Sequence, residues 1–495
     1  MIGSLFAWLN GLLGEGTFSL GDGYAILGDY YFRFPEKLPQ LTPLSFAFIL
    51  FVFLVFCLAR PFKGKLRPFV LLAADLFFLY SFSTYHLGSL VFLALIGWLL
   101  ALLNQILKNK WALLGGVLVP VLILSTFKFA PLFGQNILMP LGLSFVTFKI
   151  ISAMVDAYKG EIDVRDPLVY FNYALFFPAV TAGPIHRYAY FKDVLTKDQP
   201  FDYTEAKNGG FQMMLGMFEK IVFCDFIASV VTRASAEGMT GGNTLLAIIL
   251  YSFQIYLDFD AYSNISIGCA KLLGFSFPKN FNTPYLAATI KEFWRRWHIS
   301  LGSFFRDYVY IPLGGSRKGK VRQYLAILAV FLLSGIWHGS TMNFVWWGLG
   351  HGVLQIIEEF LLSPFRKMKL KKPFVLIFRI FGILINFIFV TILWQLFKYS
   401  DMGQLAGVWQ ALRTPQKLDF ELMGLTANEV KWLFFILITV IVTDILRNRW
   451  DMVKAYSKLF FPFRWLGYAV LILVFLVFGV YGGSVSASDF IYQWF

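Results

Sequence analysis

Three of the five histidines in this chain lie close together, as His298, His338 and His351. The last two stand in the tryptophan-rich apolar sequence SGIWHGSTMNFVWWGLGHG, where a titratable side chain is costly to bury. Ionisable groups in such segments are functional candidates, and a buried imidazole stays neutral and can accept a proton near neutral pH. We therefore expect His338 to be a general base. The alternative is an imidazole that only holds a structural hydrogen bond.

The sequence KEFWRRWHISLGSFF predicts a single helix over residues 291–305. One apolar stripe at three- and four-residue spacing runs along it, formed by Trp294, Trp297, His298, Leu301 and Phe305. Glu292 lies three and four residues before Arg295 and Arg296, a spacing at which side chains pair on a helix. The arginines alone fit an amphipathic helix at the membrane interface. That explanation leaves His298 on the apolar stripe without a role.

The apolar run that ends at His338 carries two small residues at helical spacing, Gly335 and Gly339. This spacing lets a second helix backbone approach closely. Ser334 lies one turn before the histidine. We expect His338 to face a packed protein neighbour and not lipid.

The composition excludes an ordinary water-soluble globule, because 58% of the 495 residues are hydrophobic and 19% are aromatic. The mean hydropathy is +0.65. We predict an all-α polytopic membrane protein with about eleven or twelve membrane helices. The clearest apolar runs cover residues 42–59, 68–84, 87–107, 111–127, 321–338, 342–362, 374–397, 431–446 and 464–481. More polar runs cover residues 168–185, 211–231 and 244–262.

The net charge of +14 does not indicate nucleic-acid binding, because the basic residues cluster between the predicted spans. Such clusters, including residues 317–322, mark cytoplasmic loops. Residues 1–40 and 401–429 carry more acidic than basic side chains and are predicted to be extracytoplasmic, as are both termini. The first fourteen residues lack the pattern of a cleaved signal and suggest a short interfacial helix.

Three apolar segments are interrupted by glycine and proline, at residues 134–142, 177–184 and 275–284. Irregular backbone at membrane depth persists only where protein or water satisfies its polar groups. We expect re-entrant segments around a central cavity, with plain surface loops as the alternative. The three cysteines have no metal-ligand spacing, and no HExxH or GxSxG motif occurs, so no metal or bound cofactor is expected.

The motifs IKEFWRRWHISLGSFFRDYVYIPLGG, SGIWHG and WWGLGHG together resemble the membrane-bound O-acyltransferase superfamily, specifically its bacterial alginate O-acetyltransferase branch. The similarity extends to residues 139–160, 182–188, 254–286 and the aromatic tail 490–495. It implies a bundle around a membrane tunnel, with the active-site histidine at His338 and a second polar position at His298. The sequence departs from the branch at Asp260 and Asn264, where a serine and an aspartate are common.

The resemblance also implies partners. A cytosolic thioester, acetyl-CoA or an acyl carrier protein, would donate the acyl group. A separate extracytoplasmic SGNH-hydrolase-like acetyltransferase would pass it to a polysaccharide. The side chains predicted to contact substrate stand in the same motifs as the two histidines: Trp297, Trp337, Ser334, Arg295 and Asn343.

We divide the chain into an extracytoplasmic or interfacial segment 1–40, membrane helices 41–130, a catalytic core 131–362 and further membrane helices 363–495. The function expected is O-acetylation of an extracytoplasmic polysaccharide, alginate or a similar glycan, from the bacterial cytoplasmic membrane. D-alanyl transfer to teichoic acid is the alternative within the enzyme class. A transporter or flippase of a glycan precursor is the alternative from another class, because broken helices around a polar site also describe transporters. A non-catalytic export scaffold would give no reason for buried histidines.

Overall fold

The fold is that of a helical protein, as predicted. The computed structural model describes residues 24–27, 30–33, 40–60, 66–134, 137–197, 200–362, 372–399, 401–414, 417–479 and 490. The predicted interfacial helix and nearly all of the tail 490–495 lie outside these residues. The strands of the described part are β1 (Tyr24–Leu27) and β2 (Tyr30–Arg33), which pair as an antiparallel hairpin that the sequence patterns did not predict.

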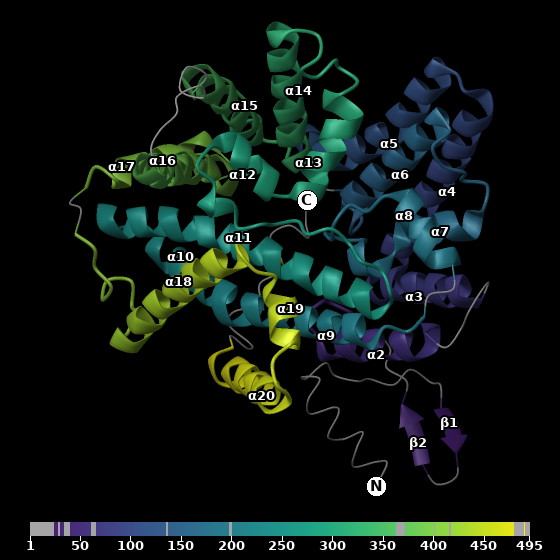
Figure 1. Cartoon of the computed structure of the whole chain (residues 1–495), viewed down its shortest axis with the longest axis horizontal. Helices are drawn as coiled ribbons and strands as arrows, with labels where there is room; N and C mark the ends of the chain where they lie inside the picture. Colours follow the sequence, from purple (N-terminus) through teal and green to yellow (C-terminus); the bar gives the residue numbers. More distant parts are fainter. Residues whose placement is uncertain are drawn as a thin grey trace.

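The amino-terminal third forms a group of packed helices, purple to blue in Figure 1. These are α2 (Phe46–Ala59), α3 (Leu66–Phe82), α4 (Thr84–Leu107), α5 (Lys110–Phe129), η1 (Ala130–Phe133) and α6 (Leu143–Lys159). Polar side chains set where helices begin: the hydroxyl of Ser45 accepts the N–H of Phe48, and that of Ser83 accepts the N–H of His86. Helix α4 packs along α5 and α6.

The middle of the chain supplies the central helices. They are α7 (Pro167–Leu175), η2 (Phe177–Ala179), α8 (Tyr188–Thr196), α9 (Tyr203–Phe218), η3 (Glu219–Cys224), α10 (Asp225–Ala234), α11 (Gly241–Leu272), η4 (Pro284–Leu286), α12 (Ile290–Arg296), α13 (Ile299–Phe305), η5 (Arg306–Tyr310), α14 (Lys320–His338) and α15 (Met342–Leu362). The segments η3 and η5 are π-helical turns. Helix α11 packs along α9 and α10 through the interior.

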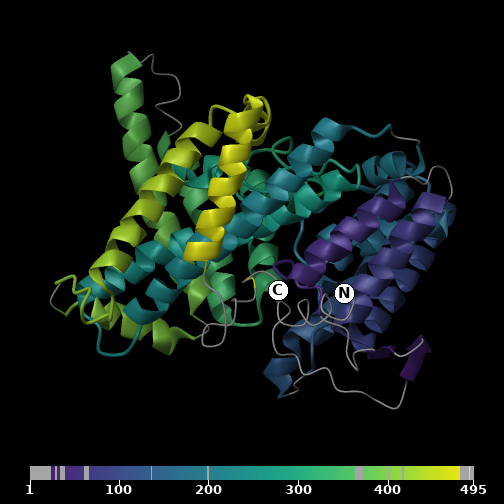
Figure 2. The same cartoon turned by 90° about the horizontal axis from the view of Figure 1, so that it is seen from below.

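The remaining helices lie mostly on the periphery. They are α16 (Lys372–Lys398), α17 (Met402–Ala411), α18 (Ala427–Arg447), α19 (Met452–Ser457) and α20 (Phe461–Phe478). Helix α16 packs against α15 and α11. No residue of α20 is buried. Figure 2 shows the green and yellow helices of this part on one side, the purple and blue amino-terminal helices on the other, and the teal helices between them.

Six helices in the described part are long and apolar enough to cross a membrane. They span Thr84–Leu107, Lys110–Phe133, Gly241–Leu272, Lys320–His338, Pro373–Lys398 and Phe461–Phe478. The prediction of eleven or twelve membrane helices also counts the clear apolar runs 42–59, 68–84, 342–362 and 431–446, which form the helices α2, α3, α15 and α18. The more polar run 211–231 is divided between α9, η3 and α10. The run 168–185 is helical only to Leu175 before η2 begins, because Pro178 and Pro184 interrupt it. The chain is a multi-pass membrane protein.

Of the three interrupted segments, residues 177–184 are buried throughout, as expected for irregular backbone inside the protein. Residues 275–284 are buried only in part, and Gly134, Ile137 and Leu138 are exposed, as in the alternative of a surface loop. Residues 180–186 form no helix and all are buried. Gly142 begins α6 with φ +79°, and a Cβ there would clash with the carbonyl oxygen of Val180. Only glycine lets these two buried backbone segments approach so closely.

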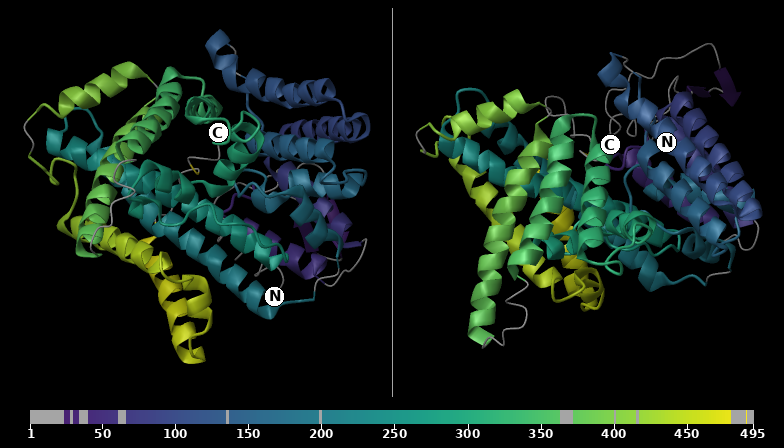
Figure 3. Two further views of the ribbon diagram at one scale, coloured as in Figure 1. Left: turned by 45° about the horizontal axis from the view of Figure 1, so that its top comes forward. Right: turned by 90° about the horizontal axis from the view of Figure 1, so that it is seen from above.

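Helices α14 and α15 form an antiparallel hairpin that crosses at glycine. A Cβ on Gly335 would clash with the carbonyl oxygen of Phe344, and one on Gly348 would clash with that of Phe331. Gly339 meets the Phe344 ring instead of a backbone. The close approach predicted from the glycine spacing is therefore confirmed at Gly335. Figure 3 shows this hairpin in two further views, in green.

Candidate functional site

The predicted single helix over residues 291–305 is wrong, because the structure breaks it at the histidine. Helix α12 ends at Arg296, Trp297 is extended, and α13 begins at Ile299. His298 itself has φ 43° and ψ 54°, the left-handed conformation that is costly for a residue with a side chain. Residues held this way cluster at functional sites, where the surrounding structure maintains the strain.

The segment before α12 accounts for the break. The N–H of Asn282 donates to the carbonyl oxygen of Arg296 at 2.9 Å, and the N–H of Ile299 donates to that of Asn280 at 2.9 Å. The side-chain oxygen of Asn280 accepts from the hydroxyl of Ser300 at 2.6 Å. These bonds satisfy the backbone groups that a continuous helix would have paired internally. As a result, the ring of His298 packs into the interior, 1% exposed, against Phe259 with ring centroids 4.6 Å apart.

His338 is the last residue of α14 and is 3% exposed. Its ring lies 5.0 Å from that of Trp347 and 5.0 Å from that of Phe397, both at steep angles. These rings belong to α15 and α16, so three helices enclose the imidazole. The expectation that His338 faces protein is confirmed.

Trp337 joins the two histidines. Its ring centroid lies 4.4 Å from that of His338 and 6.4 Å from that of His298. The two imidazoles lie within electrostatic range of each other. The structure thus brings together two residues that the sequence places forty positions apart. The indole Nε1 of Trp337 is buried and has no hydrogen-bond partner among the described residues, so it can donate to a bound group.

Lys128 is a neighbour that the sequence analysis missed. Its ammonium group donates to the carbonyl oxygen of Trp337, lies 5.3 Å from the centroid of the Trp337 ring, and is within electrostatic range of His338. The missed signal is its position, because Lys128 is a lone charged residue near the end of the apolar run 111–133.

Two other side chains predicted to contact substrate are buried. Ser334 lies in α14, and Trp297 lies at the break between α12 and α13. Trp297 packs against Phe281 and Trp394, at 4.9 Å and 4.8 Å between ring centroids. It therefore packs the helix break against α16 and against the segment before η4. Asn343 is buried, and its amide donates to the carbonyl oxygen of Tyr399 at 2.6 Å, which ties α15 to the end of α16.

Glu292 forms an ion pair with only one of the two arginines that the spacing predicted as its partners. Arg296 contacts it at 2.8 Å, whereas Arg295 is exposed and forms no ion pair among the described residues. Burial raises the pKa of Glu292, but the N–H of Ala288 and the guanidinium of Arg296 outweigh it, so the net pKa is lowered. This carboxylate therefore anchors α12 as an anion.

The other three histidines, His351, His86 and His186, make contacts that suit a structural role. The Nδ1 of His351 accepts from the indole of Trp294 at 3.3 Å, and its ring is enclosed by aromatic side chains. The ring nitrogen of His86 accepts the N–H of Leu141 at 3.3 Å. The ring of His186 stacks on Phe277 with centroids 4.5 Å apart. Groups of three or more side chains that could hold a metal ion are absent from the described part of the chain.

The fold and the site define a multi-pass membrane protein with two buried histidines joined by a tryptophan. Residues 30–400 match the model of MBOAT, the membrane-bound O-acyltransferase family. The chain belongs to this family.

Three relatives differ in what their names say they modify. The probable alginate O-acetylase AlgI of Pseudomonas syringae pv. tomato is 32% identical over 346 residues, 65% of this chain and 64% of that protein. The peptidoglycan O-acetyltransferase of Helicobacter pylori is 31% identical over 413 residues, 73% of this chain and 77% of that protein. The teichoic acid D-alanyltransferase of Bacillus subtilis is 30% identical over 254 residues, 48% of this chain and 62% of that protein. The chain thus spans somewhat under two thirds of the length of the alginate O-acetylase.

Proposed function

We propose that this protein is a membrane-bound O-acetyltransferase that moves an acetyl group from a cytosolic thioester to hydroxyl groups of an extracytoplasmic polysaccharide. The observation that carries the proposal is the convergence of His298 and His338 on Trp337, inside the region that matches the acyltransferase family. Two of the relatives above are named as O-acetylating enzymes of a glycan.

His338 is the proposed general base. Its neutral imidazole removes the proton from the acceptor hydroxyl while the oxygen attacks the thioester carbonyl carbon. The carbon–sulfur bond then breaks, and the imidazolium returns the proton to the leaving thiolate, so that an ester and a free thiol result. A positioned base of this kind contributes roughly 10²- to 10⁴-fold in rate.

The surrounding donors would stabilise the negative charge that develops on the carbonyl oxygen. The indole N–H of Trp337 is an available buried donor, and Lys128 places a positive charge beside it. His298 would orient the donor or contribute to the same stabilisation. Its strained conformation fixes where its ring can point.

The donor would be acetyl-CoA or an acyl carrier protein that reaches the histidines from the cytosol. The acceptor side would open on the outer face of a bacterial cytoplasmic membrane. Of this chain, only residues 1–40 and 401–429 are proposed to form sizeable outer segments, which is little to bind a polymer. We therefore include a separate extracytoplasmic SGNH-hydrolase-like acetyltransferase that completes the transfer, as the resemblance to the alginate branch suggests.

Glycan analysis of a deletion strain tests the acyl group and the acceptor directly. The proposal expects ester-bound acetate to disappear from a cell-surface polysaccharide and to return with the intact gene. Loss of ester-bound D-alanine would instead identify the teichoic acid reaction. Loss of the polysaccharide itself, with its acetylation level unchanged, would identify a transporter.

Reconstitution tests the donor and the partner. Vesicles that contain the purified protein and an acetyl thioester inside should release free thiol when an acceptor is present outside. Replacing acetyl-CoA by an acetylated carrier protein identifies the donor. Full acetylation of the polymer by this chain alone would remove the need for the partner.

A further inference from the structure

A cavity of about 650 Å³ lies between α9, α11, α18, α19 and α20. Neither His298 nor His338 lines it. It is therefore distinct from the histidine site, and one of its walls is α20, an apolar helix none of whose residues is buried.

Much of the cavity wall is apolar. Side chains from the three helices α9, α11 and α20 supply this part: Leu215, Phe218, Leu257, Val470, Leu471 and Val474. Such a wall suits hydrocarbon chains. A water-soluble ligand would gain little from it.

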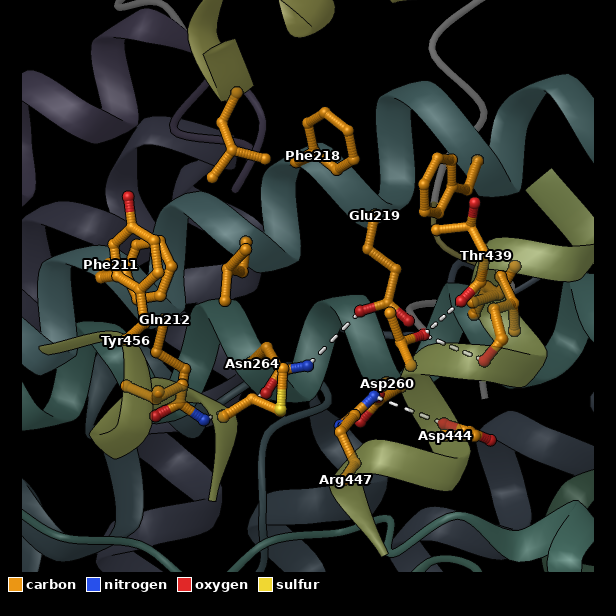
Figure 4. A pocket seen from close by; sticks show the side chains of 18 of the residues that line it. Phe211, Gln212, Phe218, Glu219, Asp260, Asn264, Thr439, Asp444, Arg447 and Tyr456 are labelled. Carbon is orange, nitrogen blue, oxygen red and sulfur yellow. Dashed lines mark hydrogen bonds and ion pairs between the residues drawn. The ribbon is translucent and has the colours of Figure 1, made fainter. Parts of the chain in front are cut away.

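One part of the cavity lining is charged, and its carboxyl groups outnumber its guanidinium group. Arg447 contacts Asp260 at 2.7 Å and lies 3.9 Å from Asp444, which also accepts the hydroxyl of Tyr256 at 2.9 Å. Glu219 lies within electrostatic range of all three charged groups, and these four side chains appear together in Figure 4. The guanidinium of Arg447 thus serves three carboxyl groups, of which Asp444 also lies within electrostatic range of Arg296.

Glu219 is the carboxyl group left over. Its nearest described partner is the amide of Asn264 at 3.4 Å, and no cationic side chain of the described residues lies within ion-pair distance of it. It stands on the π-helical turn η3, a distortion that is frequent at functional sites. Burial and the neighbouring carboxylates favour the protonated form of Glu219, and a bound cation would favour the anion.

A cation of the protein stands farther along the same cavity. Lys271 donates to the side-chain oxygen of Gln212 at 2.9 Å, and Gln212 donates to Asn264 at 3.0 Å. Two helical turns, about 10 Å, separate Asn264 from Lys271 on α11. The cavity is therefore lined by both positive and negative groups, and the amides of Gln212 and Asn264 connect Lys271 to Glu219. Lys279 and Asp451 also line it.

We propose that this cavity binds a bilayer phospholipid with a primary ammonium head group, whose ammonium pairs with Glu219 and whose phosphate faces Lys271. A phosphoethanolamine head carries both of the opposite charges within one group. The ammonium also supplies N–H donors, which a trimethylated head lacks. Hydrocarbon chains would pack against α20.

Lipid titration of the purified, delipidated full-length protein tests the proposal. Phosphatidylethanolamine, phosphatidylcholine and phosphatidylglycerol with identical acyl chains are compared, and bound lipid is counted by native mass spectrometry. We expect phosphatidylethanolamine to bind about tenfold more tightly than the other two, because charge-assisted hydrogen bonds of its ammonium are involved. Equal binding of all three lipids would overturn the proposal.

Two variants locate the site. Glu219→Gln should weaken phosphatidylethanolamine binding about tenfold and leave phosphatidylglycerol binding unchanged. Val474→Trp fills the cavity and should abolish binding, whereas Val477→Trp is the matched control, since Val477 is 62% exposed on the same helix and does not line the cavity. Binding that is equally strong in both tryptophan variants would place the lipid elsewhere.

His338→Gln should bind lipid normally, which separates this proposal from the acyl-transfer mechanism.

Discussion

The N–H of Ile299 donates a hydrogen bond to the carbonyl oxygen of Asn280 at 2.9 Å, and this contact holds the helix open at His298. The side chain of Asn280 adds bonds from the hydroxyl of Ser300 and to the hydroxyl of Ser263. One asparagine thus connects a long interior helix to the strained histidine. The geometry of the candidate site depends on a residue outside the histidine motif.

Asn280→Ala should reduce the turnover number while leaving the protein folded. The change removes the side-chain bonds of Asn280 to Ser263 and to the hydroxyl and N–H of Ser300, and each buried group left unpaired costs about 1–3 kcal/mol of unfolding free energy. The backbone bond from Ile299 to the carbonyl of Asn280 remains, but the start of α13 next to His298 is held less firmly. Asn104→Ala is the matched control, because Asn104 is equally buried and its amide donates to the carbonyl oxygen of Leu100 at 2.8 Å, on α4. Melting temperature and kcat are measured for both. An equal loss of kcat in the two variants would show that Asn280 does not position His298.

Most of this fold can be predicted from the sequence, because long apolar runs directly indicate membrane helices. The glycine spacing at Gly335 likewise predicts a helix crossing, since only a missing Cβ permits it. The break at His298 could not be predicted, because the apolar stripe continues through it and the bonds that open it come from Asn280, 20 residues before Ser300.

The charged side chains that line the cavity next to α20 could not be predicted from the sequence either. Asp260 and Arg447 are 187 residues apart, and no local pattern pairs them. The departure of Asp260 and Asn264 from the alginate branch was visible, but its consequence depends on which helices meet there. Lys128, by contrast, could have been predicted as a site residue, because it is the lone charged residue in an apolar run.

Gly348→Ala should destabilise the α14–α15 hairpin by about 1–3 kcal/mol, because the added methyl group would clash with the carbonyl oxygen of Phe331. The matched control is Gly115→Ala on α5, where a Cβ meets nothing within 4 Å. This control should be neutral or stabilising by up to about 1 kcal/mol, since alanine is the better helix former. Thermal unfolding in detergent measures both. A Gly348→Ala protein as stable as the wild type would contradict the close crossing.

Lys128→Met should lower kcat about tenfold with little change in KM, because its charge is expected to act on the oxyanion that forms during transfer. Lys110→Met removes an exposed lysine from the other end of the same helix and serves as the control. Kinetics with a fixed thioester donor distinguish the two. A rise in KM at unchanged kcat would instead assign Lys128 to ground-state binding of the donor.

Membrane orientation is tested by introducing one exposed cysteine at a time in a Cys57→Ala background, in which the remaining Cys224 and Cys269 are buried. Gln404→Cys should react with an impermeant maleimide in intact cells, and Lys318→Cys only after permeabilisation. Both positions are exposed in the structure, so access depends on the side of the membrane alone. The reverse pattern would invert the proposed topology and would place the donor side of the site on the outer face.

The decisive variants concern His338. His338→Ala should lose roughly 10²- to 10⁴-fold or more in transfer rate, the range that a positioned base supplies. His338→Gln keeps volume and hydrogen bonding but cannot take the proton, so it should be nearly as inactive. His351→Ala and His86→Ala should retain most activity, because these histidines contact only Trp294 or the backbone through their ring nitrogens. A purely structural His338 predicts another order, in which the glutamine variant is active and the alanine variant loses activity in proportion to its melting temperature. Measuring both quantities on all four variants separates the two, and a stable, active His338→Gln protein would exclude the general-base mechanism.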